Sequence, residues 1–197
     1  MTKADFFSHI SGYWEDRHAE PGETERLRAF SRHFRLRPGE RVLDVGCGSS
    51  RLVPVICEWI GGAGSLVELD FAAGMLEIGR AKPHPKNVTF MLGDAHQLPL
   101  PDGDFDKVIA LALLPHLDDK AAALKEFHRV LKPGGLLLIA HQMGREALDR
   151  LHGESSDPVK RDLLPGNTAL AGLLADAGFS GSEILDEPQQ LVVWAQA

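Results

Sequence analysis

Short apolar runs alternate with amphipathic segments along most of the chain, and this alternation predicts the fold. The apolar runs occupy residues 41–46, 65–69, 88–92, 106–111 and 135–140. Segments with helical periodicity occupy residues 23–36, 50–61, 72–81 and 118–131. The run at 135–140 reads GLLLIA, without polar alternation, which is typical of a strand buried on both faces. Strands that are connected by helices form a parallel sheet, so the pattern predicts a doubly wound α/β fold.

The C-terminal residues break this rhythm. A helical pattern at 168–177 ends at Gly178, and strand-like runs follow at 182–186 and 190–196. A short link at Glu187 and Pro188 joins the two runs, which predicts a hairpin and therefore an antiparallel strand. We expect a single domain, which divides into an N-terminal helical cap at 1–37, a core at 38–140, a segment with a helix and a lid-like loop at 141–167, and a C-terminal helix and hairpin at 168–197.

A glycine-rich turn follows the first predicted strand, in the stretch VLDVGCGSSRL at 42–52. Gly46 and Gly48 allow a ligand to approach the backbone closely. A dinucleotide site would need a third glycine where Arg51 stands, and Asp44 would repel a pyrophosphate. A P-loop is excluded because no Gly-Lys-Ser/Thr is present. A cationic ligand without phosphates fits this acid, and S-adenosylmethionine, which carries ammonium and sulfonium groups, is such a ligand.

Two further acids follow predicted strands, Asp70 after the second and Asp94 after the third. The carboxyl ends of parallel strands meet at one edge of the sheet, so these acids and Asp44 are expected to form one rim. The carboxylate of Asp70 can accept both ribose hydroxyls. The residues that we expect at the adenine are Asp94 and Ala95 for its polar edge, and Phe71 and Met75 for its faces.

Several motifs recur in an order that points to one family. They are VLDVGCG (42–48), ELD (68–70) with ML (75–76), GDA (93–95) with LP (98–99), FD (105–106), LLPHL (113–117) and RVLKPGG (129–135). In this order they resemble the class I S-adenosylmethionine-dependent methyltransferases, from about residue 6 to residue 138. The branch most similar includes the ubiquinone and menaquinone biosynthesis methyltransferases, whose aromatic start is echoed by FF (6–7) and YWE (13–15).

The resemblance implies a Rossmann-like sheet with strand order 3-2-1-4-5-7-6, whose seventh strand is antiparallel. It implies S-adenosylmethionine as cofactor and S-adenosylhomocysteine as product. The residues that it places around the methionine part of the cofactor are Asp44, Gly46, Cys47, Gly48, Ala110 and Leu111, and it assigns the ribose to Asp70. Two positions depart from the family pattern: Ser49-Ser50 replaces a frequent Thr-Gly, and Glu68 stands where a small residue is common. We expect Ser50 to cap the following helix.

Methyl transfer from a sulfonium is an in-line displacement, for which the protein mainly supplies alignment. A general base helps when the acceptor holds a proton, and His116 and His141 follow the fourth and fifth predicted strands. The alternative for each is a histidine that only packs. Candidate substrate residues are Tyr13, Arg145 and His152, of which the last two can hold an acidic group. The spacing of the histidines matches no standard metal site, so we expect no metal.

Composition and charge reduce the number of function classes that fit the sequence. The 197 residues include 21 Lys and Arg against 28 Asp and Glu, a formal net charge of −7, which argues against nucleic-acid binding. We find no signal peptide and no apolar run long enough to span a membrane, and therefore expect a cytoplasmic protein. The sequence predicts a methyltransferase that acts on a small molecule. A cofactor-binding protein without catalysis, and an NAD-dependent oxidoreductase, remain the alternatives; the acceptor atom and the oligomeric state stay open.

Overall fold

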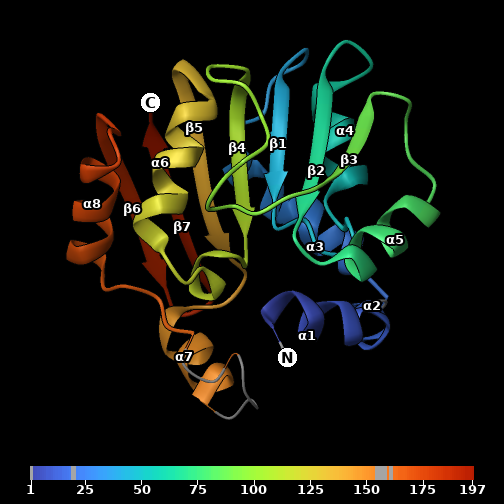
Figure 1. The fold of residues 1–197 in the computed structure, drawn as a ribbon, viewed down its shortest axis with the longest axis horizontal. Helices are drawn as coiled ribbons and strands as arrows, with labels where there is room; N and C mark the ends of the chain where they lie inside the picture. Colours follow the sequence, from blue (N-terminus) through green and yellow to red (C-terminus); the bar gives the residue numbers. More distant parts are fainter. Residues whose placement is uncertain (1, 19–20, 154–158, 160–161) are drawn as a thin grey trace.

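A seven-stranded sheet forms the centre of the computed structural model, which describes residues 2–18, 21–153, 159 and 162–197 (Figure 1). The strands are β1 (Arg41–Val45), β2 (Ser65–Asp70), β3 (Val88–Leu92), β4 (Phe105–Leu111), β5 (Leu131–His141), β6 (Gly181–Glu187) and β7 (Gln190–Gln196). Their order is β3-β2-β1-β4-β5-β7-β6. Strands β1 to β5 are parallel, and β7 is antiparallel to both β5 and β6. The expected sheet order and C-terminal hairpin are therefore confirmed.

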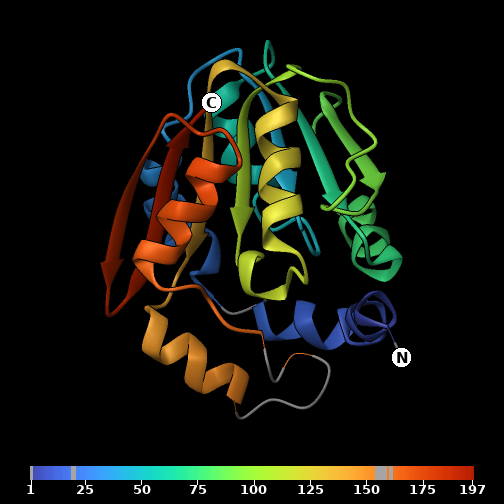
Figure 2. The same ribbon diagram turned by 60° about the vertical axis from the view of Figure 1, so that its left-hand side comes forward.

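Helices cover both faces of the sheet, so its central strands are buried on both sides (Figure 2). The helices on these faces are α3 (Glu23–Phe30), α4 (Val53–Ile60), α5 (Ala73–Ala81), α6 (Lys120–Val130) and α8 (Asn167–Asp176). One apolar core packs α6 and α8 against the sheet, and the other packs α3 and α4. Successive side chains of β1 alternate between them: Val42 joins the second core, while Leu43 and Val45 join the first. This explains why the strand has no polar alternation.

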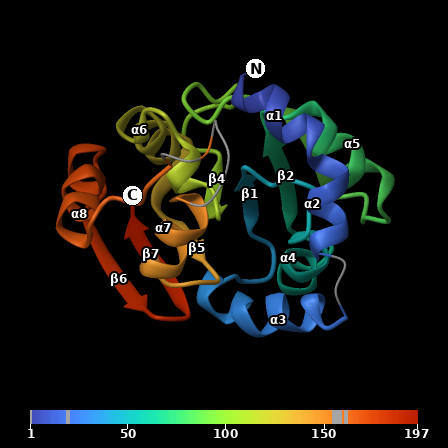
Figure 3. The same cartoon turned by 90° about the horizontal axis from the view of Figure 1, so that it is seen from below.

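The remaining elements gather beyond the carboxyl ends of the strands (Figure 3). They are α1 (Lys3–His9), α2 (Ser11–His18), α7 (Arg145–Gly153) and the short turn η2 (Leu114–His116). Helices α1 and α2 pack on α5. At this contact an added Cβ on Gly74 would lie 2.7 Å from the carbonyl oxygen of Ser8, so the backbones touch because position 74 is a glycine. Below, we call α1 and α2 together the roof.

Three boundaries differ from the sequence prediction. The helix expected at 50–61 begins at Val53, because Ser50 adopts a left-handed φ of 63°. The expectation that Ser50 caps this helix is wrong: Leu52 holds the cap position without a side-chain bond, and the Ser50 hydroxyl lies 3.8 Å from Cys47 Sγ. The segment 23–36 divides into α3 and the 3₁₀ turn η1 (Ser31–Phe34). The strand expected at 135–140 begins earlier, at Leu131, because Leu131 already pairs with Phe105; a register shift follows this pair.

Candidate functional site

The glycine turn after β1 is fixed to the end of β2 by backbone contacts. The N–H groups of Gly46 and Cys47 both donate to the carbonyl oxygen of Leu69, at 2.7 and 3.1 Å. Asp70 accepts from the Gly48 N–H at Oδ2 and from the Ala72 N–H at Oδ1, each at 2.8 Å. Burial raises the pKa of Asp70, while these backbone hydrogen bonds act in the opposite direction. Asp70 therefore supports the turn and still has acceptor lone pairs for a ligand.

A cavity of about 680 Å³ lies at this turn and gathers most of the residues that were predicted to hold the cofactor. These residues are Asp44, Gly46, Cys47, Gly48, Asp70, Phe71, Met75 and Leu111. Ala110 is only 1% exposed and is not among the lining residues; Ala112, with a left-handed φ of 57°, lines the wall instead. The roof contributes Phe7 and Trp14.

A second cavity, of about 740 Å³, adjoins the first because Gly46, Asp70 and Phe71 line both. Asp94 and Ala95, the predicted adenine residues, line this second cavity. Burial acts to raise the pKa of Asp94, but hydrogen bonds from His96 lower it overall. The backbone N–H and ring nitrogen Nδ1 of His96 both contact Asp94 Oδ1, at 2.9 and 2.6 Å.

A third cavity, of about 1080 Å³, opens on the other side of the first and shares Trp14, Arg51 and His116 with it. Its apolar walls are formed by Leu111, Met143, Leu148 and Leu151, and its polar walls by Glu23, Arg26, Arg51, His141 and Gln142. His116 lines all three cavities, so it stands where they meet. His141 is 2% exposed and ends β5. The structure thus brings the two candidate bases to one cavity.

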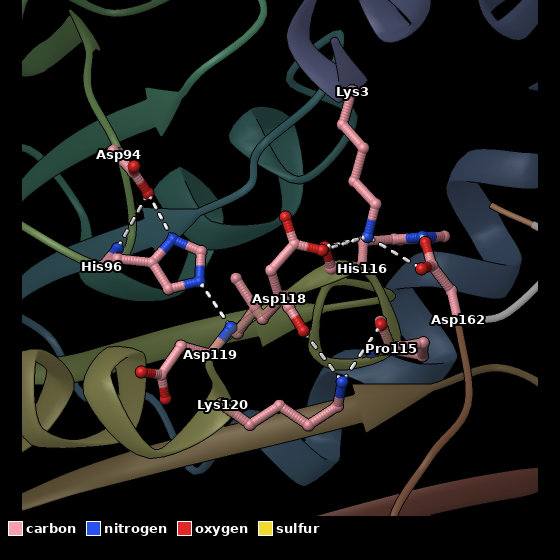
Figure 4. A network of polar contacts seen from close by, with 10 residues as sticks. Lys3, Asp94, His96, Pro115, His116, Asp118, Asp119, Lys120 and Asp162 are labelled. Carbon is pink, nitrogen blue, oxygen red and sulfur yellow. Dashed lines mark hydrogen bonds and ion pairs between the residues drawn. The ribbon is translucent and has the colours of Figure 1, made fainter. Parts of the chain in front are cut away.

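His116 is held by residues from distant parts of the chain (Figure 4). Its ring nitrogen Nδ1 lies 2.7 Å from Asp162 Oδ2. Lys3 Nζ donates to Asp162 Oδ1 at 2.7 Å, to Asp118 Oδ1 at 2.8 Å and to the carbonyl oxygen of His116 at 3.0 Å. Burial alone would raise the pKa of Asp162, but its hydrogen bonds with His116 and Lys3 hold it below the ordinary value. Asp162 is therefore an anion that orients the imidazole.

Other predicted residues lie elsewhere. Tyr13 is 66% exposed and does not line the three cavities. The guanidinium of Arg145 contacts Asp186 at 3.2 Å, the Pro165 carbonyl at 2.6 Å and Asn167 at 2.7 Å, away from these cavities. His152 belongs to α7, but its side chain is outside the described part of the structure. Their proposed contacts with substrate stay predictions.

Sequence reasoning missed Asp162 and Lys3, whereas Trp14 belongs to the aromatic opening segment that the resemblance places over the cofactor. No sequence pattern links the first two to His116, which is 46 residues from Asp162 and 113 from Lys3 along the chain. Among the residues that the structure describes, no group of His, Cys, Asp and Glu could hold a metal ion. None of the described helices combines the length and the apolar character that a bilayer crossing requires.

The donor set fits S-adenosylmethionine. Oδ2 of Asp44 is buried without a hydrogen-bond partner, and Asp44 lines the first cavity beside the two glycines. An unpartnered buried carboxyl oxygen favours a ligand that brings a positive charge or a donor. An added Cβ on Gly46 would lie 2.6 Å from Leu113 Cδ1, so only glycine leaves the cavity wall as it is.

We therefore expect Gly46→Ala to destabilise the protein more than Gly48→Ala. Both glycines have a positive φ, at 70° and 55°, which costs roughly 1–2 kcal/mol for alanine. An added Cβ on Gly48 meets no atom within 4 Å, whereas that on Gly46 displaces Leu113. Chemical denaturation should show a loss of free energy of unfolding that is larger by about 1 kcal/mol or more for Gly46→Ala. Equal losses would contradict the crowding at position 46.

Comparison with known proteins agrees with this geometry. Residues 43–139 match the family model described as a methyltransferase domain. A demethylmenaquinone methyltransferase of Lysinibacillus sphaericus is 38% identical over 109 residues, covering 54% of this chain and 46% of the relative. A ubiquinone/menaquinone biosynthesis C-methyltransferase of Coxiella burnetii is 37% identical over 109 residues, covering 53% and 44%. The chain spans about half the length of these curated relatives.

A solved structure shares the whole fold. The crystal structure of an S-adenosylmethionine-dependent methyltransferase from Aquifex aeolicus superposes with a TM-score of 0.75 at 21% identity, covering 100% of this chain and 99% of the other. At that identity the likeness establishes the architecture, while the family model and the curated relatives establish kinship in sequence. The chain carries a methyltransferase domain over residues 43–139 and is similar in sequence to quinone-biosynthesis methyltransferases, while its fold is that of an S-adenosylmethionine-dependent methyltransferase of known structure.

Proposed function

We propose that this protein transfers the methyl group of S-adenosylmethionine to a small-molecule acceptor. The observation that carries the proposal is the continuity of the site: one cavity gathers the glycine turn, Asp44 and Asp70, and it meets at His116 a further cavity that has both apolar and polar walls. Bound S-adenosylmethionine would supply a methyl group on a sulfonium, which is activated without help from the protein. The chain itself has to bind, align and exclude water.

Each part of the cofactor has residues of matching chemistry. Asp70 would accept the ribose hydroxyls, and Asp94 with Ala95, in the second cavity, would receive the adenine. The backbone at 46–48 and the buried Asp44 would hold the methionine end. Asp44 also disfavours a dinucleotide, because it would face the pyrophosphate, so the site does not favour the oxidoreductase alternative.

The third cavity fits an acceptor with an apolar body and a removable proton. Leu111, Met143 and Leu148 form its apolar walls, and His116 and His141 are its candidate bases. With Nδ1 committed to Asp162, neutral His116 would accept the proton of the acceptor at Nε2. Several curated relatives are named demethylmenaquinone methyltransferases, so a reduced naphthoquinone is the first acceptor to test. The net charge of −7 also favours a small molecule over a nucleic acid.

Calorimetry with the purified chain tests the cofactor. We expect S-adenosylmethionine and S-adenosylhomocysteine to bind at one site per chain and NAD to give no heat of binding. Incubation with radiolabelled S-adenosylmethionine and a reduced naphthoquinone should then transfer label to the acceptor. Binding of NAD without either sulfur compound would overturn the proposal. Cofactor binding without transfer to any acceptor in a broad panel would favour the non-catalytic alternative.

A further inference from the structure

Two acids, Asp44 and Glu68, face one another next to the glycine turn. The proposed chemistry uses Asp44 but gives no role to Glu68, and neither does the family resemblance. Asp44 of β1 and Glu68 of β2 are register partners in parallel strands. Register partners point to the same face of a sheet from strands about 4.8 Å apart. Asp44 is 1% exposed and Glu68 0%. Asp44 Oδ2 and both carboxyl oxygens of Glu68 have no hydrogen-bond partner among the described residues.

The surroundings of this pair leave its charge largely uncompensated. Four titratable groups face the pair: Asp70 on β2, Cys47 in the glycine turn, Cys57 on α4 and Arg51 after the turn. The hydroxyl of Ser50 lies beside them. On the next strand, Phe90 of β3 is the register partner of Glu68. The guanidinium of Arg51 is already paired with Glu23, at 2.6 Å. Two adjacent buried carboxylates repel each other strongly, so such a pair retains a proton.

The titration of the two acids agrees with this geometry. Burial raises the pKa of Glu68 to about 7, against the opposing effect of Ser50, Cys47 and Asp44. Burial, followed by the negative charges of Glu68 and Asp70, raises the pKa of Asp44 well above its ordinary value. Near neutral pH the pair therefore holds a proton that a nearby positive charge can displace.

We infer that Glu68 makes the cofactor site distinguish the sulfonium cofactor from its thioether product. The Asp44–Glu68 pair shares a proton while the cavity holds product or no ligand, and releases it when the sulfonium enters. The inference rests on the proposed function, because it needs S-adenosylmethionine in the cavity that Asp44 lines. S-adenosylmethionine carries one more positive charge than S-adenosylhomocysteine, and a cation beside an acid favours the ionised form. After methyl transfer that charge is gone and the proton returns.

Thermodynamic linkage predicts the direction in which the affinity for the cofactor changes with pH. A ligand whose binding releases a proton binds more tightly as the pH rises. The affinity for S-adenosylmethionine should therefore increase, relative to that for S-adenosylhomocysteine, between pH 6 and pH 8. If the sulfonium lowers the proton affinity of the pair by one pKa unit, the ratio of dissociation constants changes by up to about tenfold.

Isothermal titration calorimetry in two buffers of different ionisation enthalpy measures the protons directly. At pH 7 we expect S-adenosylmethionine to release a larger fraction of a proton than S-adenosylhomocysteine. Glu68→Gln keeps the shape of the side chain and removes its titration, so this difference and the pH dependence of the affinity ratio should disappear. Glu77→Gln is the matched control: Glu77 is exposed on α5, and its replacement should leave both quantities unchanged.

The wild-type protein alone can overturn the inference, whatever the folding of the variants. Equal proton release by the two ligands would contradict it, as would a ratio of affinities that does not change with pH. His116 also lines the cavity, so a difference that persists in Glu68→Gln but vanishes in His116→Gln would assign the proton to the histidine and refute the role of Glu68. If neither ligand binds, the proposed function itself fails, which is a distinct result.

Discussion

Asp70→Ala should weaken the binding of S-adenosylhomocysteine roughly 10- to 100-fold, which corresponds to the ~1.5–3 kcal/mol of a hydrogen bond to a charged group. The carboxylate is 6% exposed and lines both the first and the second cavity. Its loss removes the proposed acceptor for the ribose and also leaves the N–H groups of Gly48 and Ala72 without this partner. Calorimetric titration of the variant measures the effect.

The control for this variant is Asp176→Ala, at the exposed end of α8 and far from the cavities, which should bind as the wild type does. Thermal unfolding of Asp70→Ala separates a lost ligand contact from a lost fold. Unchanged affinity in a folded Asp70→Ala protein would remove Asp70 from the site.

His116→Ala should lower kcat by ~10²–10⁴-fold, the usual contribution of a general base, and leave cofactor affinity near that of the wild type. The reason is its position where the three cavities meet, with Asp162 fixing Nδ1. The measurement is the rate of S-adenosylhomocysteine formation with the reduced naphthoquinone, at saturating concentrations of both ligands. His84→Ala, which changes an exposed histidine after α5, should retain full turnover.

Asp162→Asn distinguishes an oriented base from a histidine that only packs. The amide removes the charge that selects one tautomer of His116, so kcat should fall while the KM for the acceptor changes little. Full turnover in His116→Ala would instead leave His141, in the same third cavity, as the candidate base.

The sequence alone predicted the strands, because most of them are short apolar runs that helical segments or turns separate. Their order in the sheet came from the resemblance, and the structure confirms it. The start of α4 could not be predicted from the sequence. The left-handed backbone at Ser50 moves the start of α4 to Val53, and a serine does not indicate a positive φ. Strand β5 begins early because Leu131 pairs with Phe105, a contact between segments that periodicity cannot relate.

The rim of acids was predictable because Asp44 lies near the end of β1, Asp70 ends β2 and Asp94 follows β3, and parallel strands end at one edge of a sheet. The support of His116 was not, since Lys3 and Asp162 lie 159 residues apart and belong to segments without a shared pattern. Glu68 stood out as a departure from the family pattern, but its meaning required the register that sets it opposite Asp44. Arg145 illustrates the reverse case: its position after β5 suggested a contact with substrate, but its side chain contacts β6, the start of α8 and Pro165 just before α8.

The contact of Lys3 with Asp162 connects the roof to the residue that orients His116. Lys3 lines the second cavity and at the same moment neutralises the anion that orients His116. A displacement of α1 away from this cavity would also withdraw Lys3 from Asp162. In the proposed reaction, a site opened in this way would lack the contact that supports the orientation of His116.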